Sequence, residues 1–548
     1  MKKLLGLLLV VLISGVVMAA PRTQDALTDL ASYVPVEAPV FAVVQTDAGF
    51  VETLNGVLAN LNGNLPEEAT LPSMEEILAE MFAPVAYDYM RSVIGDKAGL
   101  YVTSVDALVF GMGDPVVVMI EMSSQDAGLE LIEAMTAGQT FTQMELDNGG
   151  IFFQPEYNLD TAYVLLDSIL FAGTFSPDLS EIITPGEDRL SLAQSEGFVN
   201  TMETLPADHY NAVVYLDLSD AISTLGPFLG MMVEGMEELD FNLLADLVGQ
   251  QAFGLAVMEG RALVMDYVQT SDVFVAAESI DMALLERVPS TAAFLIHTRE
   301  VGNKVLGVME FLPYLDEVIM MLNDDPYAED ISGLGDTLHT FITLSFEGTF
   351  GMPIEDAAAA INGDMLTSLS MDYADGMFML DNTTIFSNEV PDVTAQLVEE
   401  IATIITESFA PATFEDGIVN APLGAILSLP DVLTFSIGSN DDVVAIGGTE
   451  SVNFALNPGD ATITSTEGFA FESGMFLSDP STLLYIDAAP LRATLSKFVD
   501  DNADMFSSSD MRDIQDLMVL LNIVDTASVT TAQGDGFVAA RFVLSLGD

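Results

Sequence analysis

The chain contains no cysteine and no tryptophan among its 548 residues. Without cysteine there can be no disulfide framework, no thiolate metal site and no lipid attached through an N-terminal cysteine. Basic residues are also scarce, because 14 Lys and Arg face 84 Asp and Glu and give a formal net charge of −70. Such a chain repels phosphate-rich surfaces, which excludes nucleic acid and anionic membrane surfaces as partners.

Catalytic motifs are lacking as well. The sequence has no Gly-x-Ser-x-Gly elbow, no His-Glu-x-x-His pair and no phosphate-binding glycine loop. Only three histidines are present, His209, His297 and His339, and none has the spacing of a metal-ligand pair. His297 lies in an apolar stretch, which is typical of a packed and hydrogen-bonded core residue. We therefore expect a non-catalytic protein.

The first residues have the pattern of a targeting signal. Two lysines precede an apolar run, Leu4 to Met18, and an Ala-Ala-Pro sequence follows it. This order is typical of a secretory signal peptide. A retained membrane anchor is the alternative, but the run is short for a span of about 20 residues. We expect residues 1–20 to be cleaved and the mature chain to be soluble and extracytoplasmic, either periplasmic or secreted.

The chain is rich in apolar residues as well as in acidic ones. Half of the residues are hydrophobic, so the chain can bury a large core and is not a disordered acidic polymer. The acid must then lie on the surface, where mutual repulsion favours solubility and is relieved by salt. Two explanations of the acidity stay open: adaptation to saline or cation-rich surroundings, and a compositional habit of the source organism.

The sequence repeats itself. Residues 195–217 and 466–487 both begin with Ser/Thr-Glu-Gly-Phe, continue to a proline and end in an apolar run closed by Tyr-x-Asp. A Val-Pro pair also precedes a short apolar strand twice, at Val34 and at Val288. A repeat of this length indicates a duplicated packing unit. We therefore predict two similar halves, residues 33–276 and residues 287–548.

Within each half, a strand led by proline is followed by helical sequence and then by a hairpin of two apolar strands, and this order occurs twice. Turn sequences such as Asp375-Gly376 and residues 534–536 mark the hairpins. Hairpins dominate and no long alternation of buried parallel strands is visible. The pattern predicts an α+β fold in which antiparallel β-sheets carry helices on one face, each half being built from two strand–helix–hairpin units.

Three blocks of the first half carry a family resemblance. They are Leu-Phe-Ala-Gly-Thr at 170–174, Leu-Ala-Gln-Ser-Glu-Gly-Phe at 192–198, and the Leu-Pro pair at 205–206 that leads into Tyr-Leu-Asp at 215–217. The chain resembles a family of exported bacterial proteins, domain-of-unknown-function family 3352. The resemblance implies an extracytoplasmic location and supplies no catalytic residues. The second half departs from the pattern, because Ile-Thr-Ser-Thr at 463–466 replaces the start of the second block.

Acidic pairs are the candidate metal ligands. Calcium prefers oxygen ligands, and four residues in two such pairs are calcium candidates: Asp324, Asp325, Asp441 and Asp442. None belongs to a spaced Asp-x-Asp-x-Asp-Gly loop, and solvated acidic loops are the alternative interpretation. No other metal and no organic cofactor is expected.

Methionine is abundant, with 29 residues. Six of them lie in the most apolar helical stretches: Met231, Met232, Met236, Met309, Met320 and Met321. Methionine recurs at adaptable apolar binding surfaces but also fills gaps in ordinary cores. These residues therefore predict either core packing or a groove for an apolar ligand.

Three classes of function follow from these observations. The favoured one is a non-catalytic binding or interaction module of the cell envelope or the extracellular space, with a protein partner. The second is a carrier of a lipid-like or other apolar ligand. The third is a carboxylate-dependent, calcium-assisted hydrolase. Repetition without catalytic motifs favours the first, and nothing in the sequence predicts the oligomeric state.

Overall fold

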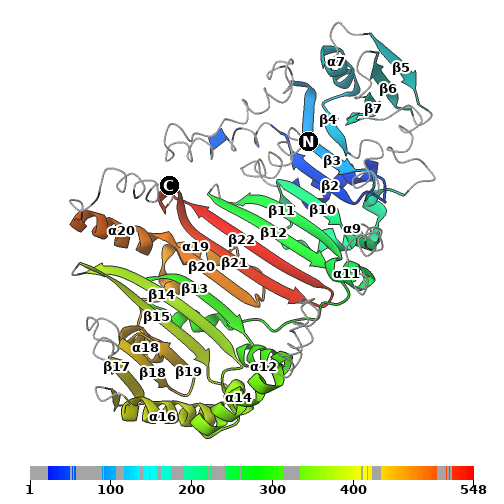
Figure 1. Ribbon diagram of the computed structural model, residues 1–548. Helices are drawn as coiled ribbons and strands as arrows, with labels where there is room; N and C mark the ends of the chain where they lie inside the picture. Colours follow the sequence, from blue (N-terminus) through cyan, green and yellow to red (C-terminus); the bar gives the residue numbers. More distant parts are fainter. Residues whose placement is uncertain are drawn as a thin grey trace. The chain divides into compact units, whose positions relative to one another are not determined.

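The computed structural model describes residues 22–47, 92–105, 116–135, 140–146, 149–156, 162–173, 190–219, 241–258, 261–312, 334–374, 376–408, 412–415, 417–422, 434–502 and 521–547, with a few single positions between them. The chain divides into two compact units (Figure 1). The first comprises Met1–Ala277 and Thr531–Asp548, and the second comprises Glu278–Thr530. The predicted signal peptide, residues 1–20, lies outside the described residues.

The chain is α+β, and all of its described strands except one two-stranded pair belong to a large antiparallel sheet, which confirms the prediction of an α+β fold with antiparallel strands. None of the described helices combines the length and the apolar character that a membrane span requires.

The first unit is built on strands that pair antiparallel, each with the next. In spatial order they are β5 (Phe141–Glu145), β6 (Ile151–Pro155), β7 (Ala162–Leu166), β8 (Ile169–Gly173), β4 (Val116–Met122), β3 (Ile94–Val102), β2 (Val40–Gln45), β10 (Ala212–Asp217), β11 (Gln250–Met258), β12 (Ala262–Thr270) and β22 (Phe537–Leu546). A separate pair joins β1 (Arg22–Thr23) to β9 (His209–Tyr210). The last strand of the chain, β22, is thus part of the first unit.

The helices that the structure describes in the first unit are short. They are α2 (Gln24–Thr28), η1 (Asp29–Tyr33), α7 (Gln125–Met135), η3 (Leu192–Gln194), α9 (Glu196–Glu203) and α11 (Phe241–Val248). The apolar stripe of α7 places Leu131 and Ile132 in a buried cluster with Phe153 of β6, Leu165 of β7 and Leu170 of β8. Burial of each such side chain contributes about 1.5–3 kcal/mol, which fixes α7 on this part of the sheet.

The second unit also consists of strands that pair antiparallel, each with the next. In spatial order they are β16 (Thr413–Glu415), β17 (Ile418–Pro422), β18 (Thr434–Ser439), β19 (Val443–Gly447), β15 (Met377–Ser387), β14 (Asp364–Ala374), β13 (Ala292–Arg299) and β20 (Thr482–Asp487). The strand β21 (Val524–Gly534) begins in this unit.

The described residues of the second unit form further helices. They are η4 (Met282–Arg287), α12 (Val301–Phe311), α14 (Leu334–Phe350), α15 (Ile354–Ala360), α16 (Pro391–Ser408), α18 (Thr449–Leu456), η7 (Ile463–Ser465), α19 (Glu467–Ser473) and α20 (Ala488–Asn502).

Helices cover both faces of the sheet around β19. Val444 is buried with Val398 and Ala402 of α16, whereas its neighbours Val443 and Ala445 are buried in the cluster that contains the apolar side of α18. Successive residues of a strand point to opposite faces, so α16 and α18 lie on opposite sides of the sheet. The expectation of helices on one face is therefore wrong here. The physical reason is that β19 is apolar on both faces and needs a cover on each.

Each unit contains the same kind of helix start beside a buried tyrosine. In the first, the Ser195 hydroxyl accepts the backbone N–H of Phe198 at 3.4 Å, and the Phe198 ring meets Tyr215 edge-on at 5.0 Å. In the second, the Thr466 hydroxyl accepts the backbone N–H of Phe469 at 3.4 Å, and Phe469 meets Tyr485 edge-on at 5.1 Å. The helix cap thus holds an aromatic ring against the sheet in both places.

Candidate functional site

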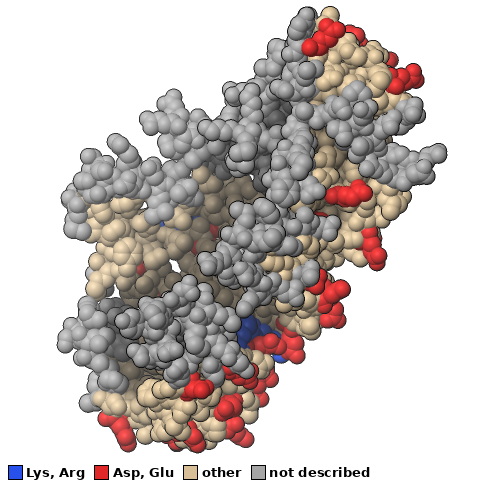
Figure 2. Space-filling model, turned by 45° about the vertical axis from the view of Figure 1, so that its right-hand side comes forward, with Lys and Arg blue, Asp and Glu red and all other residues tan. Residues whose placement is uncertain are grey.

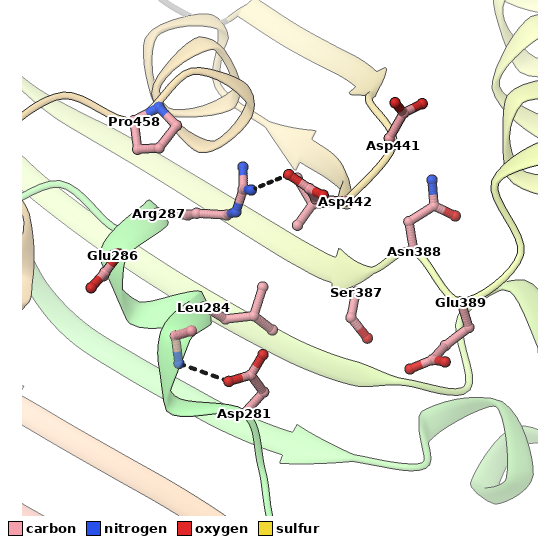
Figure 3. Close-up of a pocket in the computed structure, with 12 residues that line it drawn as sticks. Asp281, Leu284, Glu286, Arg287, Ser387, Asn388, Glu389, Asp441, Asp442 and Pro458 are labelled. Carbon is pink, nitrogen blue, oxygen red and sulfur yellow. Dashed lines mark hydrogen bonds and ion pairs between the residues drawn. The ribbon is translucent and has the colours of Figure 1, made fainter.

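An acid-lined pocket of about 480 Å³ opens in the second unit (Figure 3). It lies between η4 with its capping residue, the end of β15, and the turn between β18 and β19. Five carboxylates and one guanidinium line it: Asp281, Glu286, Glu389, Asp441, Asp442 and Arg287. The pocket is therefore strongly negative, and it contains one of the acidic pairs singled out in the sequence.

Two of these carboxylates already have partners. The Asp281 carboxylate accepts the backbone N–H of Ala283 at 3.0 Å and caps η4, and Asp442 accepts a hydrogen bond of 2.8 Å from Arg287 (Figure 3). Arg287 also donates to the carbonyl of Ala455 at 2.9 Å. Asp441 points away from Arg287 in Figure 3 and makes no hydrogen bond or ion pair with another described residue. The two carboxylates of this pair thus have separate surroundings.

Two of the four calcium candidates lie among the described residues. Asp441 and Asp442 are adjacent at the pocket, whereas Asp324 and Asp325 lie outside the described residues. Among the described residues, no group of three or more His, Asp or Glu side chains is arranged to hold a metal ion.

A buried histidine–aspartate pair lies behind the pocket. His297 is fully buried, and its Nε2 lies 3.2 Å from Oδ1 of Asp364, which also accepts the backbone N–H of Asp281 at 3.0 Å. The Ser387 hydroxyl accepts the backbone N–H of Asp364 at 2.7 Å. The arrangement joins β13, β14 and the cap of η4, so His297 is a packed, hydrogen-bonded core residue, as the sequence predicts.

A second buried polar cluster lies in the first unit and was not anticipated from the sequence. Arg541 of β22 donates two hydrogen bonds to Asp266 of β12, Nε to Oδ1 at 2.6 Å and Nη2 to Oδ2 at 2.7 Å. Tyr210 donates to the same Oδ2 at 2.7 Å, and Gly254 leaves room for its ring, since a Cβ there would lie 2.3 Å from it. The signal in the sequence is one charged residue within each of two apolar strands, Asp266 in β12 and Arg541 in β22.

The surroundings of this cluster favour a neutral Tyr210 and a charged Arg541. Burial, followed by the charge and hydrogen bond of Asp266, raises the pKa of Tyr210 far above its ordinary value. Burial would lower the pKa of Arg541, but the hydrogen bond and charge of Asp266 outweigh it and leave that pKa raised. The cluster is thus one fixed ion pair with a neutral phenol, which suits structure rather than proton transfer.

The predicted methionine groove is only partly described. Met309 of α12 is 7% exposed and belongs to the core. The other five lie outside the described residues: Met231, Met232, Met236, Met320 and Met321.

An exposed apolar strand segment distinguishes the second unit. Four consecutive residues at the start of β15 are exposed: Met377 at 39%, Phe378 at 46%, Met379 at 40% and Leu380 at 57%. They follow the turn at Gly376, whose φ of +79° permits the tight connection from β14. In a half-buried strand, apolar and polar residues alternate, so four apolar residues in succession on an exposed strand indicate a surface for contact.

Helix α20 fixes the hairpin that carries this segment. The Phe378 ring packs on Phe498 of α20 at 4.7 Å and on Tyr373 of β14 at 5.2 Å. Asn502 donates to the Tyr373 hydroxyl at 2.6 Å, and Thr494 donates to the carbonyl of Met371 at 2.8 Å. These contacts hold β14 and β15 in place as a rigid ribbon (yellow-green in Figure 1).

Carboxylates dominate the described surface. On the face drawn in Figure 2 they are spread widely, and basic side chains reach the surface in few places. Much of the basic complement is tied to acid within each unit, as in the exposed pair of Lys497 with Asp372, whose atoms lie 2.7 Å apart. The hydrogen bond to Lys497 lowers the pKa of Asp372.

No protein-family model, curated protein or solved structure matches the chain. The resemblance to domain-of-unknown-function family 3352 thus stays a prediction.

Proposed function

We propose that the mature protein is an exported, highly acidic, non-catalytic interaction module of the cell envelope or extracellular space, periplasmic or secreted. The observation that carries this proposal is the exposed apolar segment Met377–Leu380, four consecutive apolar residues of one strand that α20 holds in place through Phe498. A contiguous apolar patch rimmed by charge is typical of a protein–protein contact.

Export is supported by the sequence of residues 1–20, with two lysines, an apolar run and small residues at its end. The same location is implied by the resemblance to domain-of-unknown-function family 3352. The carrier alternative rests on methionines of which Met309 is a core residue, so no observation on the described residues favours it.

We also propose that the body of the protein is an internal duplication. Its support is the order of strand pairing, because β5-β6-β7-β8-β4-β3-β2-β10 in the first unit has the same sequence of connections as β16-β17-β18-β19-β15-β14-β13-β20 in the second. The isolated bridges Pro35–Ser191 and Pro289–Thr462 also occupy corresponding places. Duplication multiplies surfaces without requiring a catalytic centre, which fits an interaction module.

The test has two parts. Cell fractionation and intact-mass measurement should find the protein outside the cytoplasm and starting near residue 21. The purified mature protein should then capture a partner from the extracytoplasmic fraction, and the complex should re-form from the two purified components. The control bait is an unrelated acidic protein of similar net charge. A cytoplasmic location, or capture no better than by the control, would contradict the proposal.

A further inference from the structure

Within the part of the chain that the structure describes, the apolar segment of β15 is also an unpaired edge of its sheet. All of β15 from Met377 to Phe386 pairs with β14, but on its other side β19 pairs only with Thr383–Ser387. The carbonyl of Asn382 accepts the N–H of Gly448 at 2.9 Å, so the polar backbone groups of Asn382 point to this second side. Beyond that point, no described strand pairs with it.

The pairing pattern fixes which backbone groups are available. In an antiparallel strand, the N–H and C=O of one residue point to the same side, and the side alternates from residue to residue. Phe378 and Leu380 therefore present their N–H and C=O groups on the same side as Asn382, away from β14. The pairing of β15 with β14 contains no register shift, so this alternation runs unbroken to the turn.

We propose that this edge receives an extended segment of a partner protein, which adds a strand to β15 beside Phe378 and Leu380. The inference rests on the proposed function and names its partner surface. The outward N–H and C=O groups of Phe378 and Leu380 supply main-chain hydrogen bonds to the added strand. Exposed apolar side chains of β15 lie beside it on both faces of the sheet: Met377 and Met379 on one, Phe378 and Leu380 on the other. The partner segment is therefore apolar on both faces over about four or five residues.

Charge decides between a foreign segment and a second copy of this chain. Pairing two copies through this edge would bring together two chains that each carry a formal net charge of −70. The end of α20, which contacts the hairpin through Phe498 and Asn502, also carries two exposed carboxylates, Asp500 and Asp501. The complementary partner is an apolar segment flanked by Lys or Arg, which is attracted by this negative charge.

The experiment uses the mature full chain and a synthetic peptide of about nine residues, with alternating Val and Ile between paired lysines, long enough for one strand. Amide hydrogen exchange is followed at Phe378 and Leu380, and affinity is measured by calorimetry. A second peptide has the same side chains but N-methyl groups on alternate residues, so it keeps the charge and loses its backbone donors. We expect slowed exchange at both amides with the first peptide only.

The variant Leu380→Pro removes one outward N–H without removing a bond to β14, because proline is tolerated at an edge position. We expect this substitution to raise the Kd of the first peptide at least about tenfold. That change corresponds to the loss of one hydrogen bond together with the local strand geometry. The matched control, Leu380→Val, keeps the N–H and an apolar side chain and should bind as the natural chain does. Circular dichroism and the exchange of β14 amides check that each variant is folded.

Three results would overturn the inference. They are equal binding of the N-methylated peptide, unchanged binding by Leu380→Pro, and a dimeric native mass with Phe378 and Leu380 already protected in the absence of peptide. If Leu380→Pro still re-forms the complex with the partner of the capture experiment, the edge is not the docking site although the proposed function stands. If no partner exists, the proposed function itself fails.

Discussion

Removing Arg541 should expose how strongly the first unit depends on its buried ion pair. Asp266 is fully buried and Arg541 is 7% exposed, and the two side chains share hydrogen bonds of 2.6 and 2.7 Å between β12 and β22. In Arg541→Met the volume is kept but the Asp266 carboxylate retains only the bond from Tyr210. Breaking a buried pair in this way costs about 3–5 kcal/mol, because an uncompensated charge stays out of water.

The double variant Arg541→Met with Asp266→Leu separates this charge effect from lost packing. With both charges gone, we expect it to be more stable than Arg541→Met alone by at least about 1 kcal/mol, since apolar replacements of buried pairs are often neutral.

The measurement is urea denaturation followed by circular dichroism, with hydrogen exchange of β12 and β22 amides to assign the transition to the first unit. Because the chain has two units, its urea denaturation need not follow a single two-state transition. The stabilities of the natural chain and its variants are therefore compared from the hydrogen-exchange data. A loss below about 1 kcal/mol for Arg541→Met, or a double variant no more stable than the single one, would refute the reasoning.

Three further predictions concern the aromatic caps, a buried carboxylate and the net charge. Phe198→Ala and Phe469→Ala should each lower the free energy of local unfolding, measured by hydrogen exchange, by about 3–5 kcal/mol. If the losses of the two variants differ by more than roughly 2 kcal/mol, that result would argue against duplicated cores. Burial is the main cause that raises the pKa of Asp487, so its stabilising contribution is present below about pH 4 and lost as pH rises through the native pKa. Asp487→Asn keeps the acceptor for the N–H of Ala489 and should therefore raise Tm at neutral pH, with no gain below about pH 4; an unchanged neutral Tm would count against it. Raising potassium chloride from about 0.1 M to 1 M shortens the screening length from about 10 Å to 3 Å and should raise Tm, an effect that an equally osmotic sucrose solution should not match.

The part of the fold that the sequence predicts is local. Glycines at the hairpin turns, such as Gly376 and Gly536 with φ near +80°, were readable because only a few residue types adopt that backbone conformation. Short strands joined by such turns pair with their sequence neighbours, and the antiparallel α+β class follows from this. The burial of His297 was readable in the same way, from the apolar strand around it.

The features that matter most for the candidate sites come from pairings between distant parts of the chain. Asp266 and Arg541 are 275 positions apart and meet only because β22 pairs with β12. The acid-lined pocket likewise joins Asp281 to Asp442 from separate elements. No local pattern encodes such meetings, because a strand's apolar alternation specifies its buried face but not its neighbour.

By itself, the sequence determined the short strands and the turns that join them, the acidic composition from which we predict that phosphate-rich surfaces are poor partners, and the repeated blocks. Tertiary structure alone decided that helices cover both faces around β19 and that β19 stops short of the apolar start of β15. The physical reason is that composition and turns act within a few residues, whereas the exposure of Phe378 and Leu380 depends on where a neighbouring strand ends.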